Sequence, residues 1–255
     1  SLSERFGDNW RYSWYAGVVE TLLGDFASAK GSFSQVLNQL PGEAAPKLAL
    51  AAVSELILQE GGYQSSALLH DELSPAAAGL TQHLRDVPRS VFERMAADGA
   101  TDGTWSLTVT SPEGLRFHAT RLYALVWMTN PTTVSSAFGL ARMLMCEGEV
   151  ELAIKALDKV PNASRHYRMA QLTAILCLVA EGATEDHIRL AARRLEQIPS
   201  TEPRFLQIKV AVIEAGLTYL RAHQASTNVA LFEYPFTIRG LRRGLAQTLR
   251  DQARV

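Results

Sequence analysis

The sequence holds little that would indicate secretion, membrane insertion or a general affinity for polyanions. Its two cysteines, Cys146 and Cys177, lie far apart in the chain, which excludes a disulfide framework and predicts buried thiols in a reducing compartment. The formal net charge of −1 at pH 7 gives no general attraction to nucleic acid or anionic lipid. The longest apolar stretch, Leu172–Ala180, is about half of a membrane span. We expect a cytoplasmic protein and, because the sequence opens at Ser1 without Met or a signal peptide, a piece of a longer one.

Motifs for catalysis are also missing. The sequence has no Gly-rich phosphate loop, no HExxH and no CxxC. Gly24-Asp25-Phe26-Ala27 looks like the Asp-Phe-Gly metal loop of a kinase, but it is the turn of a repeat. One group of possible metal ligands, His70-Asp71-Glu72 with His83, lies in a loop-rich segment and is interpreted as solvated polar chain. We predict no catalytic residue, no cofactor and no metal site.

What the sequence does contain is a spacing of small and large residues, in residues 10–41, that suits two packed antiparallel helices. Gly17 and Ala29 are small, so the two helices approach closely, and Phe33 fills the space beside them. Gly24 lets the chain leave the helical conformation between the helices, and Pro41 ends the second because it has no N–H to donate. This spacing is that of a tetratricopeptide repeat (TPR), a helical hairpin of about 34 residues that needs neighbours to bury its apolar face.

The same pattern returns in the second half of the chain. A repeat that starts at Val134 has small residues and a turn glycine at the matching positions, namely Ala141, Gly148 and Ala153. The next repeat starts at Arg168, with Gly182 in its turn and Ala191 in its second helix. Because a glycine recurs at the same repeat position, we predict a stack of TPRs.

The second repeat is interrupted. Its first helix is predicted at Ala44–Glu60, ended by Gly61-Gly62, and its second near Leu115–Thr129. Residues 61–116 form an insert, in which we expect one or two short helices near residues 76–97 and an extended segment at 105–109. Ser111-Pro112 is interpreted as an N-cap followed by the first helical residue, and a hairpin of residues 105–117 is the alternative.

Two more helices are expected at the C-terminal end. The first spans Glu202–Ala222, and the last follows an N-cap at Thr237 and carries Leu241, Leu245 and Leu249 on one face. Its other face is basic, with Arg239, Arg242, Arg243, Arg250 and Arg254. The predicted fold is all-α: a TPR-type right-handed α-solenoid forming a single domain over residues 1–255, with a long insert in the second repeat and a C-terminal capping helix.

The concave groove of such a superhelix is lined by the first helix of each repeat. The candidates for binding a partner there are Arg11, Trp14 and Val18 in the first repeat, Phe138, Arg142 and Met145 in the third, and Met169, Leu172 and Leu176 in the fourth. This groove is more apolar than one that grips a peptide carboxylate, so we expect a partner helix or segments of the chain itself to fill it. Packing between adjacent repeats is the alternative role for each residue.

Several segments together resemble one family. They are GDNWRYSWYAGVVETLLGDF, LPGEAAPKLALA, SAFGLAR, STEPRFLQIK and the C-terminal ASTN, YPFT and GLRRGL. They are similar to the C-terminal TPR region of PknG-type serine/threonine protein kinases of mycobacteria and corynebacteria, over Glu4–Glu60 and about Phe117–Val255. The insert does not fit the mycobacterial pattern, which points to another branch, and we predict the corynebacterial one.

The resemblance implies more than the spacing does. In such kinases a rubredoxin-like metal module and a kinase domain precede the repeats, and since this chain contains neither, we do not expect it to bind ATP or transfer phosphate. The implied partners are its own kinase domain and protein substrates such as a forkhead-associated regulator of 2-oxoglutarate dehydrogenase, which links amino-acid supply to carbon flux. A homodimer is also implied, whereas nucleic acid and membrane insertion are not expected.

Three functions are compatible with the sequence. The favoured one is a non-catalytic interaction region of a PknG-like kinase, and the alternatives are a free-standing TPR adaptor and a helical enzyme whose insert acts as a lid. Trp10, Trp14 and Tyr15 predict an exposed apolar surface on the first repeat, and with it self-association as a two-fold dimer. The basic last helix offers a second surface.

Overall fold

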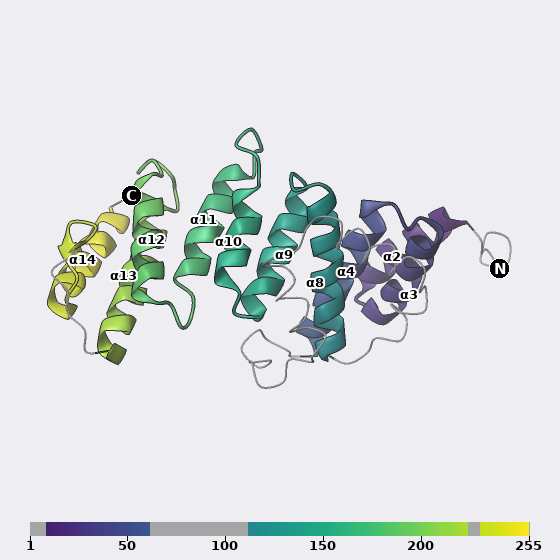
Figure 1. Ribbon diagram of the computed structural model, residues 1–255, viewed down its shortest axis with the longest axis horizontal. Helices are drawn as coiled ribbons and strands as arrows, with labels where there is room; N and C mark the ends of the chain where they lie inside the picture. Colours follow the sequence, from purple (N-terminus) through teal and green to yellow (C-terminus); the bar gives the residue numbers. More distant parts are fainter. Residues whose placement is uncertain (1–8, 62–111, 224–229, 255) are drawn as a thin grey trace. The chain divides into compact units, whose positions relative to one another are not determined.

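The computed structural model describes residues 9–61, 112–223 and 230–254, and all structural statements below refer to these ranges. In them the chain is almost entirely helical, which confirms the predicted all-α fold of TPR type. The helices form two compact units, Ser1–Pro161 and Asn162–Val255, and each unit is described by itself (Figure 1). The single domain and the right-handed superhelix concern the chain as a whole and stay predictions.

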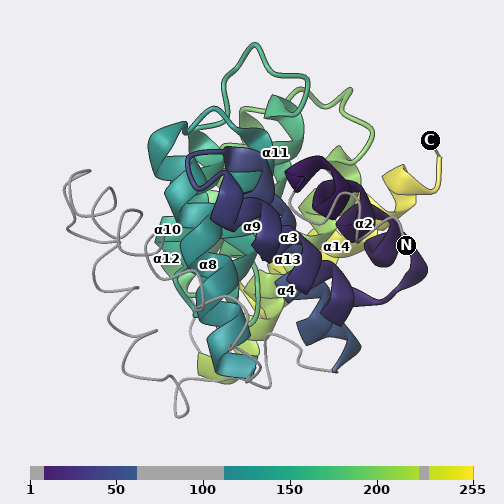
Figure 2. The same ribbon diagram turned by 90° about the vertical axis from the view of Figure 1, so that its right-hand side faces the viewer.

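In the first unit the helices pack as pairs. The pairs are α2 (Trp10–Leu23) with α3 (Phe26–Gln39), α4 (Ala44–Glu60) with α8 (Pro112–Thr129), and α9 (Val134–Cys146) with α10 (Val150–Asp158). Consecutive pairs are joined where α3 contacts α4 and α8 contacts α9, and the first helices α4 and α9 also touch (Figures 1 and 2). Each pair therefore buries its apolar face against its neighbours, as stacked repeats require.

Glycine in the left-handed conformation forms the turn in three of the repeats. Gly24, Gly148 and Gly182 have φ angles of 81°, 74° and 79°, a region that a Cβ atom makes costly. After Gly24 and after Gly148, the next backbone N–H turns back to a carbonyl of the first helix, with N–O distances of 2.9 Å from Asp25 to Glu20 and from Glu149 to Leu144. These bonds satisfy carbonyls that the helix end would leave without a donor.

Small residues lie where the paired helices come closest. Ala29, Ala153 and Ala191 are fully buried, and Ala141 is nearly so. Gly17 faces the ring of Phe33, which lies 2.8 Å from the place where a Cβ would stand. Pro41 is exposed directly after α3, which ends at Gln39.

Helix α8 begins earlier than the sequence suggested. It starts at Pro112 rather than near Leu115, so residues 112–116, which were counted with the insert, belong to the helix. Because residues 112–117 are helical, the alternative hairpin of residues 105–117 does not form there. The predicted Ser111 N-cap, the short helices near 76–97, the extended segment at 105–109 and the His70-Asp71-Glu72 group with His83 all lie outside the described residues.

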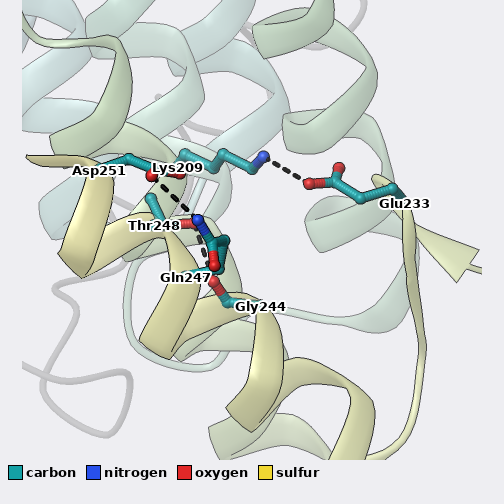
Figure 3. Close-up of polar contacts among 6 residues, drawn as sticks. All are labelled: Lys209, Glu233, Gly244, Gln247, Thr248 and Asp251. Atoms are coloured by element: carbon teal, nitrogen blue, oxygen red, sulfur yellow. Dashed lines mark hydrogen bonds and ion pairs between the residues drawn. The ribbon is translucent and has the colours of Figure 1, made fainter.

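The second unit stacks α11 (Tyr167–Leu178), α12 (Glu185–Glu196), α13 (Phe205–His223) and α14 (Ile238–Gln252), each on the next, and α11 also contacts α13. Between α13 and α14 lies a small antiparallel hairpin, β1 (Ala230–Leu231) with β2 (Tyr234–Pro235). The hairpin and helices share a core of fully buried side chains, including Ile213, Leu220, Leu231, Phe236 and Leu241. Lys209 on α13 forms an ion pair with Glu233 in the turn between β1 and β2, with 3.0 Å between Nζ and Oε1 (Figure 3). This pair links the hairpin to α13.

The leucine stripe predicted for α14 is only partly correct. Leu241 is fully buried and Leu245 half-buried, but Leu249 is 47% exposed. The helix buries Gly244 and Thr248 in its place, and the Tyr234 ring lies against Gly244. The hairpin therefore contacts a face of α14 that is rotated away from Leu245 and Leu249, and no residue pattern indicated the hairpin.

Candidate interaction surfaces

Helix α2 has a buried side and, opposite it, an exposed apolar side. The side towards α3 buries Ser13 and Gly17. On the other side, large apolar side chains are between 39% and 81% exposed; they are Tyr12, Tyr15, Val19, Leu22 and Leu23. Their spacing of i, i+3, i+7, i+10 and i+11 places them on one face of the helix, which we name the α2 outer face.

The predicted groove residues of the first repeat lie on a third side of α2, between these two. Trp14 is half-buried and meets the Phe33 ring edge-on, with 5.3 Å between ring centroids. Val18 is half-buried, and Arg11 is exposed with its guanidinium 4.6 Å from the centroid of the Trp10 ring. Trp14 therefore packs α2 against α3, and this role does not depend on a partner.

In the third repeat, Phe138, Arg142 and Met145 share one face of α9. Phe138 and Met145 are half-buried, and the Arg142 side chain is 54% exposed. Arg142 donates two hydrogen bonds to the buried carboxylate of Glu55 on α4, from Nε at 3.1 Å and from Nη2 at 3.2 Å. This fork fixes the direction of the guanidinium and joins the second repeat to the third.

Burial governs the titration of the groups around this fork. It raises the pKa of Glu55 above its ordinary value, an effect that the nearby Arg142 charge opposes. Burial, together with the Glu55 charge, likewise raises the pKa of Tyr123 on α8. The Tyr123 ring occupies the space that a side chain at Gly139 would need, so the close approach of α8 and α9 depends on glycine at that position.

In the fourth repeat the predicted residues separate. Met169 and Leu176 on α11 are 38% and 43% exposed, whereas Leu172 is 3% exposed and belongs to the core of its unit. The helical repeat explains this difference, because Leu172 is turned by about 60° from Met169 and by about 40° from Leu176, towards the core. The Arg204 guanidinium lies 3.1 Å from the Met169 sulfur.

Neither of the two cysteines of the chain is activated as a nucleophile. Burial raises the pKa of Cys146, and that of Cys177 to about 11, so both remain thiols at neutral pH and are poor nucleophiles. Within the described ranges, no three His, Cys, Asp or Glu side chains gather as they would around a metal ion. Nor does any helix of those ranges have the length and apolar character of a membrane crossing.

Helix α14 presents a basic face. Thr237 caps the helix by accepting a hydrogen bond from Gly240 N at 3.1 Å, and the Thr248 hydroxyl on the inner side donates to the Gly244 carbonyl at 2.9 Å (Figure 3). The exposed arginines on the other side are Arg239, Arg242, Arg243, Arg250 and, just beyond the helix, Arg254.

The paired helices, the left-handed glycine turns and the contacts between successive pairs define a tetratricopeptide repeat protein. The chain belongs to the family described as protein kinase G tetratricopeptide repeat, whose model matches residues 1–255. Because this match covers the whole chain, none of the 255 residues is left for a kinase domain.

Two relatives show where such a region occurs. The chain is 37% identical to the serine/threonine-protein kinase PknG of Mycobacterium leprae (strain TN) and 35% identical to that of Mycolicibacterium smegmatis, each over 258 aligned residues. Each alignment covers all of this chain but 26% of the kinase, so the chain spans about a quarter of the length of these relatives. The resemblance to PknG-type kinases is confirmed, and the corynebacterial branch stays a prediction.

The α2 outer face was only partly foreseen. Tyr15 is exposed as expected, but Trp10 and Trp14 are half-buried. The four members that were missed are Tyr12, Val19, Leu22 and Leu23. The signal was the apolar spacing in α2. This spacing was overlooked because the repeat pattern explains only the residues of α2 that face α3.

Proposed function

We propose that this chain is the non-catalytic TPR interaction region of a PknG-like serine/threonine kinase. It docks the kinase domain, supports dimerisation and recruits substrates or regulators in the cytoplasmic control of 2-oxoglutarate and amino-acid metabolism. The α2 outer face carries this proposal, since Leu22 and Leu23 are 81% and 78% exposed. Contiguous exposed apolar surface on a folded protein marks an interaction site.

The occupant we assign to the α2 outer face is the kinase domain. The matched kinases are much longer than this chain, which supports a neighbouring domain as the cover of an apolar helix face. The face has no charged member, so its contacts are apolar and depend little on salt. We assign the recruitment of other proteins to the predicted partner-binding residues of each unit by itself. In the first unit Phe138, Arg142 and Met145 share a face of α9, and in the second Met169 and Leu176 are exposed on α11.

Binding of the separately produced kinase domain of a PknG relative tests the proposal. Titration calorimetry with the 255-residue chain should show binding with a negative heat-capacity change, the mark of apolar burial. The double variant Leu22→Ser/Leu23→Ser should weaken binding by about tenfold or more, because it removes the two most exposed leucines of the face. The control Ile238→Ser/Leu249→Ser, which changes two exposed apolar residues of α14, should bind like the original chain.

Equal binding by both double variants would show that the α2 outer face does not dock the kinase domain. Complete absence of binding would favour the free-standing adaptor, because that function needs only external partners.

A further inference from the structure

The exposed arginines of α14 form one continuous surface. Arg239, Arg243 and Arg250 follow one another at i, i+4 and i+11, a spacing that returns to the same line on a helix, and Arg242 lies beside them. Arg254 extends the line past the end of the helix. We name these five residues the arginine face. From Arg239 to Arg250 it is about 16 Å long at the usual rise per residue.

The positive charge of the arginine face is hardly neutralised by other described residues. Arg239, Arg242 and Arg243 make no hydrogen bond or ion pair with any residue of the described ranges. Arg250 donates to the Ala246 carbonyl and to Gln247, both on its own helix. The acid of α14, Asp251, accepts a hydrogen bond from Gln247 at 2.9 Å (Figure 3). It lies 3.9 Å from Arg254 at the edge of the face.

Apolar side chains border the arginine face on one side. Ile238 and Leu249 are 38% and 47% exposed, and the half-buried Leu245 lies between them. A helix that only closed the end of a repeat stack would present polar side chains alone. Exposed leucine and isoleucine next to arginine give instead the mixture of apolar anchor and charge found in protein interfaces.

We propose that the arginine face binds an acidic amphipathic helix of a partner protein. Carboxylates on such a helix recur every three to four residues and match the arginine spacing, while its apolar flank covers Ile238 and Leu249. This inference goes beyond the proposed function, because it concerns the second unit and depends on neither the α2 outer face nor the kinase domain.

Other anionic partners fit the surface less well. A membrane would need a broad apolar face to insert, but Ile238 and Leu249 are the two exposed large apolar side chains of α14, and its inner side is buried at Leu241, Gly244 and Thr248. Single-stranded nucleic acid is held by stacking on aromatic residues, and α14 contains none. A phosphate backbone would also leave Leu249 without an apolar contact.

Binding of three probes to the full 255-residue chain tests the proposal. Fluorescence anisotropy measures binding of two labelled probes: a synthetic helical peptide of about 20 residues, with Glu on one face and Leu along its edge, and a short DNA duplex. Sedimentation measures binding to the third probe, phosphatidylglycerol vesicles. We expect the peptide to bind best, and its affinity to fall when salt rises from about 0.05 M to about 0.15 M. The same peptide with Gln in place of Glu should not bind.

Two charge-matched variants locate the contact. Arg239→Gln/Arg243→Gln/Arg250→Gln should weaken peptide binding by about tenfold or more. The control Arg165→Gln/Arg193→Gln/Arg221→Gln removes three exposed arginines elsewhere in the same unit, and it should bind the peptide like the original chain. Leu249→Ser should weaken binding at every salt concentration, because it removes an apolar contact. Circular dichroism confirms that each variant is folded.

Several results would overturn the proposal. They are equal loss of binding in the two triple variants, binding of the Gln peptide, tighter binding of the duplex or of the vesicles than of the peptide, and no binding of any probe.

Discussion

At the scale of single residues, Gly24 and Gly31 form a matched pair in the first repeat. Neither has an atom within 4 Å of the place where a Cβ would stand, so backbone conformation alone decides the effect of alanine. Gly24 has a φ of 81°, and Gly24→Ala should lower the free energy of unfolding by about 1–2 kcal/mol. Gly31 lies within α3, and Gly31→Ala should raise it by about 0.5–1 kcal/mol. Urea denaturation measures both, and effects of the same sign would contradict the left-handed turn.

Ala29 tests how closely the helices of the first repeat pack. It is fully buried, so Ala29→Leu has to displace neighbouring side chains and should lower the free energy of unfolding by about 1–3 kcal/mol. Ala27 is exposed on the same helix, and Ala27→Leu should change stability by less than about 0.5 kcal/mol. Equal melting temperatures for the two variants would show that Ala29 is not at a helix contact.

The fork between Arg142 and Glu55 predicts unequal effects of its two partners. Arg142→Gln leaves a buried carboxylate without its cation and should lower the free energy of unfolding by about 1–3 kcal/mol at neutral pH. Glu55→Gln removes the buried charge and leaves Arg142 half in solvent, so it should cost less. If Glu55→Gln lowered the free energy of unfolding more than Arg142→Gln does, the burial of the Glu55 carboxylate would not be the larger effect.

The same carboxylate has a pH signature. The folded chain raises the pKa of Glu55 above its ordinary value of 4.5, so the protonated form stabilises the fold. The Glu55 contribution is therefore fully present below pH 4.5 and is lost as the pH rises through the raised pKa. The free energy of unfolding should be measured against pH for the original chain and for Glu55→Gln. The difference between them, original minus variant, should fall as the pH rises through this window.

At the scale of helices, apolar and small-residue spacing predicted most elements from the sequence. Val134 is the first residue of α9, as predicted, and Thr237 caps α14. The predicted buried face of α14 was wrong, because that face is set by Tyr234 of the hairpin and by Phe236 just after it, and short local patterns do not indicate a hairpin. The α2 outer face was missed for a related reason: a helix can have both a buried side and an exposed apolar side, and the repeat pattern explains only the buried one.

Removal of the insert tests the second repeat as an element. α4 and α8 pack together although residues 62–111 separate them in the chain, and the end of α4 and the start of α8 lie at the same side of the unit in Figures 1 and 2. Replacing residues 63–110 with a Gly/Ser bridge should therefore keep helical circular dichroism and cooperative melting. A deletion that extends to Gly114 is the comparison, because it also removes the first turn of α8 and should be less stable. Loss of cooperative melting in the shorter deletion would assign the insert to the core.

For the molecule as a whole, the α2 outer face predicts self-association when no other domain covers it. Light scattering with the 255-residue chain should show a mass that rises with concentration towards a dimer. Leu22→Ser/Leu23→Ser should shift the mass towards the monomer, while Ile238→Ser/Leu249→Ser should not. A monomer at every concentration would exclude the dimer.

The pairing of α4 with α8 has a consequence for how the chain can be divided. The cost of closing a loop grows only with the logarithm of its length, so a long connection weakens such a pair little. Covalent continuity at this point is then not essential to the fold. A chain cleaved within 62–111 would still present one fragment ending in α4 and another beginning with α8, and their exposed apolar faces are complementary. This repeat could thus be reassembled from two polypeptides. The cleavage point could also carry the new termini of a circularly permuted chain, or divide the chain into two halves that fold only when proteins fused to them bind each other.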